Sequence, residues 1–369
     1  MRVAPSQLVP GCILLMEVKG KSNRPIIVKN TVLTDKHIEI LEKFLVESVE
    51  VSSKLSDGEE FSPKSSVHRN DEKIEFPPDV RKEKNELSFM ANYKKAVTAF
   101  KKQYQKWQNS MPIDIPAIRK IMIPLLEQIE TIPSAAIYAL HEHGEKRDYI
   151  YYHCVAVSLT SAYLGKKMGY SKGEWLQIGL AGLLSDCGLA RIDADILLKA
   201  GPLTESEYTA VKNHPTYSYR MVENLPTITP GVKLAVLQHH ERVDGYGYPL
   251  GISKEKIHQY AKVVAVADMY HAMTSERLYR KKISPFKVIE EIQRERYLKF
   301  DSETVDCFLA SIDSLTLGAK VILSDNTSGE IVFINPAQPT RPMVRIAESD
   351  EIISLEQVPE LYIEKISAS

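Results

Sequence analysis

The amino-acid sequence predicts a mainly α protein, in which a helical-bundle domain is flanked by a small N-terminal α+β module and a small C-terminal β-rich domain. Two observations support this fold class. Helical periodicity with recognisable start and stop signals fills the middle of the chain, whereas short apolar runs separated by turn residues fill both ends. A chain of 369 residues is long enough for two or three domains of ordinary size.

Charge, cysteine content and hydropathy narrow the classes of function. The 47 basic and 48 acidic residues leave a net charge of -1, so the basic excess of a nucleic-acid-binding protein is missing. The four cysteines are scattered without a CxxC pair, which favours free thiols in a reducing compartment. No signal peptide and no run of about 18 apolar residues is visible. We therefore expect a cytoplasmic protein with neither a nucleic acid nor a membrane as partner.

Residues 1–52 are expected to form the α+β module. Their short apolar runs predict strands at 12–18, 25–28 and 49–51, and a helix at 34–45 that has Thr34 as its N-cap. Residues 53–82 change in character, because Ser, Asp, Glu, Lys and Pro dominate and few apolar residues are left to bury. This second segment is predicted to be a flexible linker.

Residues 83–147 are predicted to be connecting helices, interrupted by three prolines. An apolar stripe at helical spacing runs along the first of them and consists of Tyr93, Phe100, Tyr104 and Trp107. Such a stripe packs on the following domain or forms a dimer contact. The second interpretation makes a homodimer possible.

Residues 148–313 are predicted to be consecutive helices that form one bundle domain. Their boundaries are marked by two capping boxes, by two N-caps followed by proline and by two glycines at expected helix ends: Ser171 with Glu174, Thr204 with Glu207, Thr229 with Pro230, Ser284 with Pro285, Gly169 and Gly188. Residues 315–369 switch to short strands at 320–323, 329–334, 342–346 and 361–366, which predicts the β-rich domain.

The helical domain contains histidines and aspartates of the kind that bind transition metals: His153, Asp186, His214, His239, His240 and Asp268. They lie in or at the ends of separate predicted helices, so they converge only if the bundle aims them inward. A lone histidine in a helix is more often a hydrogen-bonded or exposed residue than a ligand. The adjacent pair at 239 and 240 strengthens the ligand interpretation, because a glycine-rich loop follows it.

That loop carries a specific motif. It contains His-His-Glu, two residues, Asp-Gly, one residue and Gly-Tyr-Pro, and it ends at Tyr248 and Pro249. Here the chain resembles the HD-GYP family, which is named after a His-Asp pair and this Gly-Tyr-Pro loop. Further segments match in the family's order at 148–155, 198–215, 268–280 and 300–308. The resemblance covers about 165 residues, which is under half of the chain.

The resemblance implies a fold, an activity and a site. HD-GYP domains are helical and hydrolyse the second messenger cyclic di-GMP with two or three metal ions, which acidify water and bind phosphate oxygens. It implies that the six histidines and aspartates are metal ligands, with Asp186 as the bridging carboxylate and Asp186 and Asp268 as the catalytic carboxylates. It further implies that Tyr248, Arg277 and Arg280 contact the substrate, which is cyclic di-GMP or a related nucleotide. Iron or manganese is the expected metal.

Three positions depart from the family pattern. Ser185 stands where the family's His-Asp pair has its histidine, and a serine hydroxyl is a poor ligand for these ions. Leu189 replaces a lysine that would supply a cation near the phosphate. Tyr149 stands where members with three metals have a glutamate. These departures favour one metal site and put a second in question.

Neighbouring residues offer partial compensation. His271 lies one helical turn after Asp268, so its imidazole either replaces the lost ligand or makes an ordinary hydrogen bond. Cys187 is a soft ligand beside Asp186 or, more simply, a buried core thiol. His141 and His143 are expected to face solvent.

Two functions from different classes follow. The chain is a metal-dependent phosphodiesterase for cyclic di-GMP with reduced activity, because Ser185 and Leu189 replace the family His and Lys. Alternatively, it is a catalytically degenerate domain that binds a nucleotide or a protein in second-messenger signalling. A hydrolase for another phosphoester remains a third interpretation, since the fold does not set the substrate.

Overall fold

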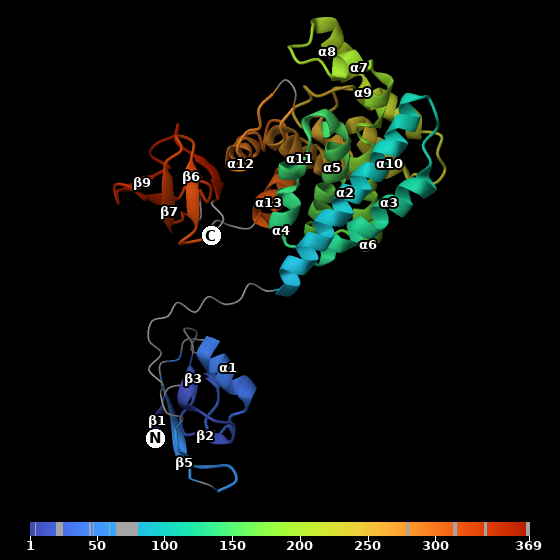
Figure 1. Cartoon of the computed structure of the whole chain (residues 1–369). Helices are drawn as coiled ribbons and strands as arrows, with labels where there is room; N and C mark the ends of the chain where they lie inside the picture. The colour runs from blue at the N-terminus through green and yellow to red at the C-terminus, as the bar shows by residue number, and fades with distance from the viewer. Residues whose placement is uncertain are drawn as a thin grey trace. The chain divides into compact units, whose positions relative to one another are not determined.

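A computed structural model describes residues 1–369 except 4, 20–24, 44, 45, 47, 59, 64–79, 278, 279, 313–315, 336, 337 and 367–369. The chain divides into two compact units, Met1–Pro77 and Pro78–Ser369. Most of the predicted linker lies outside the described residues. The predicted fold class is confirmed: helices dominate the second unit, and an antiparallel sheet follows them near the C-terminus (Figure 1).

The N-terminal unit is a small α+β module. Its elements are β1 (Arg2–Val3), β2 (Cys12–Leu14), β3 (Val18–Lys19), β4 (Pro25–Ile27), α1 (Asp35–Lys43) and β5 (Val49–Leu55). The antiparallel sheet has the order β1-β5-β2, and β3 pairs with β4 separately. Leu14, Leu41 and Val51 are fully buried in its core. The module extends beyond the predicted boundary at residue 52, because β5 continues to Leu55 and Phe61 is buried in the same core.

The second unit begins with a helical bundle. Its α-helices are α2 (Val80–Gln108), α3 (Ile115–Glu127), α4 (Ser134–Tyr138), α5 (Tyr149–Lys167), α6 (Lys172–Leu184), α7 (Ala194–Leu197), α8 (Glu205–Lys212), α9 (His214–Val222), α10 (Pro230–Gln238), α11 (Gln259–Thr274), α12 (Pro285–Arg294) and α13 (Ser302–Ser311). A short 3-10 helix, η5 (Cys187–Arg191), follows α6. Residues 153–165 of α5 are buried on every face, because this helix packs against α6, α11 and α2 together.

The start signals of these helices are confirmed. Both capping boxes form, and Pro230 and Pro285 each occupy the first turn after the predicted N-cap. Gly169 has φ +87° directly after α5, as expected of a helix end. The prediction for Gly188 is wrong, since this glycine lies inside η5, where its role is close packing.

The aromatic stripe of α2 packs inside the unit. Phe100 and Trp107 have no exposed surface, and Tyr104 is 1% exposed. These rings share one hydrophobic core with α5 and α6, so the helices predicted as connections belong structurally to the bundle. The stripe is therefore not free to form a dimer contact.

The C-terminal sheet closes the second unit. Its strands are β6 (Lys320–Leu323), β7 (Ser328–Phe333), β8 (Met343–Ile346), β9 (Ile352–Ser354) and β10 (Ile363–Ile366), in the antiparallel order β10-β6-β7-β8-β9. The strand β9 was not predicted. The Arg341 guanidinium donates to both carboxylate oxygens of Glu290 in α12, at 2.6 and 2.7 Å, and the Ser284 hydroxyl donates to the Ile363 carbonyl. These bonds fix the sheet to α12.

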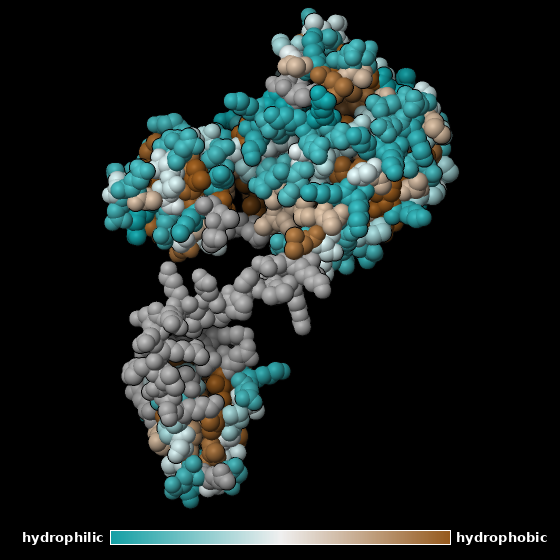
Figure 2. Space-filling view, in the orientation of Figure 1, coloured by the Kyte–Doolittle hydropathy of each residue, from teal (hydrophilic) through white to brown (hydrophobic). Residues whose placement is uncertain are grey.

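The surface of the bundle is polar on the face shown in Figure 2, where hydrophilic side chains predominate and hydrophobic ones form small patches. No helix among the described residues is long and apolar enough to cross a membrane.

Candidate metal centre

The structure brings the six predicted ligands together at the centre of the bundle. They form two groups that share Asp186, and the ligand atoms of each group lie within 4.8 Å of one another. One group consists of Asp186, His214, His239 and His240, and the other of His153, Asp186 and Asp268. Each group is large enough to hold a transition metal ion.

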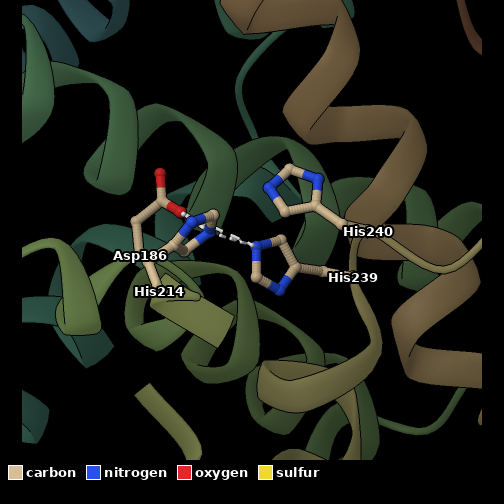
Figure 3. A group of neighbouring side chains, drawn as sticks. All are labelled: Asp186, His214, His239 and His240. Carbon is tan, nitrogen blue, oxygen red and sulfur yellow. Dashed lines mark hydrogen bonds and ion pairs between the residues drawn. The ribbon is translucent and has the colours of Figure 1, made fainter. Parts of the chain in front are cut away.

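Helix ends position the first group (Figure 3). Asp186 follows α6, His214 begins α9, and His239 and His240 follow α10. The Nε2 atom of His214 lies 3.1 Å from Asp186 Oδ1, and that of His239 lies 3.6 Å from the same oxygen. Residues at helix ends can turn toward one point, whereas residues within a helix are tied to its face.

Backbone carbonyls fix the orientation of two of these rings. His214 donates from Nδ1 to the Val211 carbonyl at 2.7 Å, and His239 donates from Nδ1 to the Val236 carbonyl at 2.9 Å. Since a carbonyl only accepts, each ring keeps its proton on Nδ1, so Nε2 is the nitrogen that offers a proton to Asp186 or a lone pair to a metal ion. The two Nε2 atoms lie 3.2 Å apart. Two facing lone pairs at this distance need a shared cation or a proton, so the donor set fits a metal ion.

The second group uses the other oxygen of the shared carboxylate. His153 Nε2 lies 2.9 Å from Asp268 Oδ1 and 3.4 Å from Asp186 Oδ2. Asp186 therefore directs Oδ1 to the first group and Oδ2 to the second. His240 Nδ1 lies 3.9 Å from Asp268 Oδ2, which joins the two groups from the opposite side.

Burial and neighbouring charges shift the pKa values of these groups. Burial opposes ionisation of Asp186, but hydrogen bonds from His153, His214 and His239 hold its pKa well below the usual value. The pKa of Asp268 is also lowered, against burial, chiefly by its bond with His153. Burial and the neighbouring His239 lower the pKa of His240 strongly. Both carboxylates are thus anionic and His240 is neutral near pH 7, which are the states that bind metal.

A layer of polar side chains lies behind His153. The Tyr149 hydroxyl and the His271 Nδ1 atom each lie 3.0 Å from His153 Nδ1, at the end of the ring that faces away from the carboxylates. Ser275 Oγ lies 3.2 Å from His271 Nδ1. His271 is absent from both candidate ligand groups of the described residues, so the hydrogen-bonding interpretation of this histidine holds and ligand replacement does not.

Ser185 and Leu189 supply no ligand. The Ser185 hydroxyl donates to the Gly182 carbonyl at 2.9 Å, within its own helix turn. Leu189 packs against the hydrophobic core. Cys187 is the predicted core thiol, since it is fully buried and burial raises its pKa to about 12. The prediction for His141 is wrong, because this ring is buried and donates to the Tyr138 carbonyl.

The glycine-rich loop is held by a buried carboxylate that was not predicted to matter. Glu241 is 4% exposed and accepts hydrogen bonds from the backbone nitrogens of Leu250 and Ile252, at 2.6 and 3.1 Å. The glutamate of the His-His-Glu motif, at the start of the glycine-rich loop, is the sequence signal from which this contact with the loop backbone could have been predicted. The Tyr248–Pro249 bond is cis, and the Tyr248 ring stacks on His240 with centroids 4.7 Å apart. The loop thereby covers one side of the first group.

Close packing of η5 on α9 sets the distance between Asp186 and His214. A Cβ on Gly188 would lie 2.3 Å from the His214 carbonyl oxygen and 2.4 Å from the Ser218 nitrogen. The Ser218 hydroxyl donates to the Ser185 carbonyl at 2.6 Å and accepts from the Gly188 nitrogen at 2.7 Å. Only glycine at position 188 permits this approach of the two backbones. The contact of Ser218 has no local signal in the sequence.

The two arginines expected to contact substrate lie outside the ligand groups. The Arg277 guanidinium lies over the Tyr149 ring, 4.4 Å from its centroid, and donates to the Ala272 carbonyl. Arg280 has an exposed side chain, and its backbone pairs with that of Arg277. Arg277 is thus near the His153 side of the centre, whereas Tyr248 is on the His240 side.

Parts of the chain are similar to known proteins. Residues 131–304 match the family described as HD domain. The chain is 32% identical over 199 residues to a cyclic di-GMP phosphodiesterase of Pseudomonas aeruginosa, which covers 54% of this chain and 48% of that protein. It is 30% identical over 190 residues to a 3'3'-cGAMP-specific phosphodiesterase of Vibrio cholerae, which covers 50% of this chain and 43% of that protein. The chain thus spans about half the length of these relatives.

Solved structures also show similarity to the chain. An HDG"Y"P protein from Bdellovibrio bacteriovorus aligns with 83% of this chain and 97% of its own, with 14% identity and a TM-score of 0.46.

Proposed function

We propose that the chain is a metal-dependent phosphodiesterase that hydrolyses cyclic di-GMP or a related cyclic dinucleotide, because residues 131–304 match the HD domain family and carry the HD-GYP motif set. Relatives named for cyclic di-GMP and for 3'3'-cGAMP support this substrate class.

The observation that carries the proposal is the geometry of Asp186. One carboxylate oxygen faces His214 and His239, and the other faces His153. A buried carboxylate with two separately coordinated oxygens is a bridging ligand in two-metal hydrolases. A structural or solvated aspartate would not need three imidazoles within 3.6 Å of its oxygens.

Iron or manganese is the metal we propose for the centre, because imidazole and carboxylate together suit these ions. His214, His239, His240 and Asp186 would hold the first ion, and His153, Asp186 and Asp268 offer a weaker second position. When bound, the metal acidifies water and draws charge from the phosphate oxygens.

The protein's own side chains prepare the reaction. The lowered pKa of Asp268 keeps this carboxylate ionised at neutral pH, and we assign it to orient the attacking water. The Tyr248 ring, stacked on His240, limits the approach to one side. We assign Arg277 and Arg280 to the substrate phosphates, because guanidinium groups form paired bonds with them.

We expect a reduced rate relative to members with the complete His-Asp pair. Ser185 and Leu189 remove one metal ligand and one cation. These same two residues favour a second candidate, a catalytically degenerate domain that binds a cyclic dinucleotide or a protein partner.

Turnover measurements distinguish the active phosphodiesterase from the catalytically degenerate domain. The full chain is incubated with cyclic di-GMP or 3'3'-cGAMP and Mn²⁺ or Fe²⁺, and products are followed by chromatography. We expect slow metal-dependent hydrolysis that chelation and Asp186→Asn abolish. If cyclic dinucleotide binds but no product forms with either metal, the degenerate candidate holds. Hydrolysis that survives both chelation and Asp186→Asn contradicts the proposed centre.

A further inference from the structure

A lysine at the end of α8 lies between two tyrosine rings beside the candidate metal centre. The Lys212 Nζ atom is 4.9 Å from the ring centroid of Tyr248 and 5.7 Å from that of Tyr208. Tyr248 in turn stacks on His240, with the ring planes 29° apart. These contacts lead without interruption from an exposed tyrosine to a candidate metal ligand.

The helix α8 presents Tyr208 and Lys212 on one face, because the two residues are four positions apart. The capping box of Thr204 and Glu207 fixes the start of this short helix, and His214 follows its end after one residue. α8 lies at one end of the bundle (Figure 1). Its outer face is thereby held beside the glycine-rich loop.

The charge on Lys212 has no carboxylate partner among the ion pairs of the described residues. Lys199, by contrast, forms an ion pair with the Glu207 carboxylate at 2.6 Å. Tyr208 is 55% exposed, so much of its ring is open to solvent. An uncompensated ammonium beside an open aromatic face suits a ligand with a phosphate next to a nucleobase.

We propose that Tyr208 and Lys212 form a subsite for one nucleobase and the adjoining non-scissile phosphate of a cyclic dinucleotide. The base stacks on Tyr208, and the ammonium binds the phosphate. This inference rests on the proposed function, because it assumes that substrate reaches the centre past Tyr248. It implies that the site selects dinucleotides over simple phosphodiesters.

Two substrates test the subsite. Cyclic di-GMP has a second phosphate and two bases, whereas methyl p-nitrophenyl phosphate is a phosphodiester with neither. Hydrolysis of both by the full chain with Mn²⁺ is compared for wild type, Tyr208→Ala, Tyr208→Trp and Lys212→Gln. Tyr362→Ala and Lys287→Gln are matched controls, because Lys287 Nζ lies 5.4 Å from the Tyr362 ring in a similar pair near the C-terminal sheet.

The expected result is a rise of about tenfold in KM for cyclic di-GMP in Tyr208→Ala and Lys212→Gln. Tyr208→Trp keeps the wild-type KM because it restores a stacking surface. Rates with the small diester stay unchanged in all variants, and the two control variants match wild type with both substrates.

Other outcomes decide against the subsite. If Tyr208→Ala and Lys212→Gln leave KM for cyclic di-GMP unchanged, or slow both substrates equally, the subsite is wrong and the residues have no role or a structural one. If wild type hydrolyses neither substrate, the proposed function fails, and calorimetric binding of cyclic di-GMP to the Mn²⁺-loaded chain decides the subsite. Binding that weakens in both variants supports it, and absent or unchanged binding overturns it.

Discussion

The Nε2 atoms of His214 and His239 lie 3.2 Å apart, while both rings donate from Nδ1 to backbone carbonyls. Neutral rings held in this way face each other with lone pairs, an arrangement that a cation relieves. His153 is the single imidazole of the other group, which it forms with Asp186 and Asp268, whereas His214 and His239 share their group with His240. The pair of His214 and His239 is therefore the stronger part of the centre.

This asymmetry predicts which variant loses metal. We expect the dialysed wild-type protein to retain about one transition metal ion per chain. His239→Ala should lose it, because one of the two imidazoles that face each other is removed, whereas His153→Ala should keep it. Elemental analysis after dialysis measures the content, and circular dichroism controls for folding. Two or more ions retained by wild type, or equal loss in the two variants, would contradict the prediction.

Restoring the two missing side chains should raise activity. In Ser185→His with Leu189→Lys, an imidazole is added next to Asp186 and a cation to η5. We expect hydrolysis of cyclic di-GMP to increase by roughly tenfold or more. Ser185→Ala with Leu189→Met is the matched control, because it changes the same positions without adding a ligand or charge. The prediction is wrong if the restored variant melts like wild type but is no faster.

Local signals in the sequence were sufficient for much of the fold. Capping boxes at Ser171 and Thr204 depend on residues three positions apart, so they are visible without tertiary contacts. The end of the N-terminal module was not visible, because Phe61 reaches its core across polar residues that resemble a linker. The burial of Trp107 in the core of α5 and α6 is likewise a long-range contact.

The residues of the site also fall into those that a motif predicts and those that only the folded structure brings in. The motif resemblance named all six residues that the structure brings together in two groups. It did not reveal that His271 of α11 joins Tyr149 at the outer end of His153, since the contact between His271 and His153 spans more than a hundred residues. Nor did it reveal Ser218, whose hydroxyl bonds two backbone groups of the segment after α6. Contacts of this kind have no periodic or motif signal.

The buried histidines predict how the metal-free protein responds to acid. Burial, then the charges of His153, His141 and Arg277, lower the pKa of His271 well below its usual value. Below about pH 6.5 the unfolded chain therefore binds a proton that the folded chain does not, so the free energy of unfolding falls as pH decreases. His153, whose pKa is raised by Asp186 and Asp268 despite burial, acts in the opposite direction.

The variant His271→Asn isolates this contribution. Its free energy of unfolding should fall less than that of wild type between about pH 7 and pH 5.5, by up to roughly 1.4 kcal/mol for each pH unit. Urea denaturation of the metal-free proteins at each pH measures the difference. His37→Asn is a control, because His37 lies near the start of α1 and is only partly buried. A pH dependence in His271→Asn equal to that of wild type would show that this imidazole is not held neutral by burial.

The contact between η5 and α9 predicts that one added methyl group disrupts the metal centre. In Gly188→Ala the new Cβ would lie 2.3 Å from the His214 carbonyl, and backbone atoms of α9 must move away to admit it. We expect the free energy of unfolding to fall by about 1–3 kcal/mol and metal retention to fall as well, because Asp186 and His214 are drawn apart. Gly173→Ala is the matched control in the first turn of α6, where a Cβ meets nothing within 4 Å. Denaturant unfolding and elemental analysis are made on both variants. Normal metal content in a destabilised Gly188→Ala protein would show that this packing supports the fold without setting the separation of the ligands.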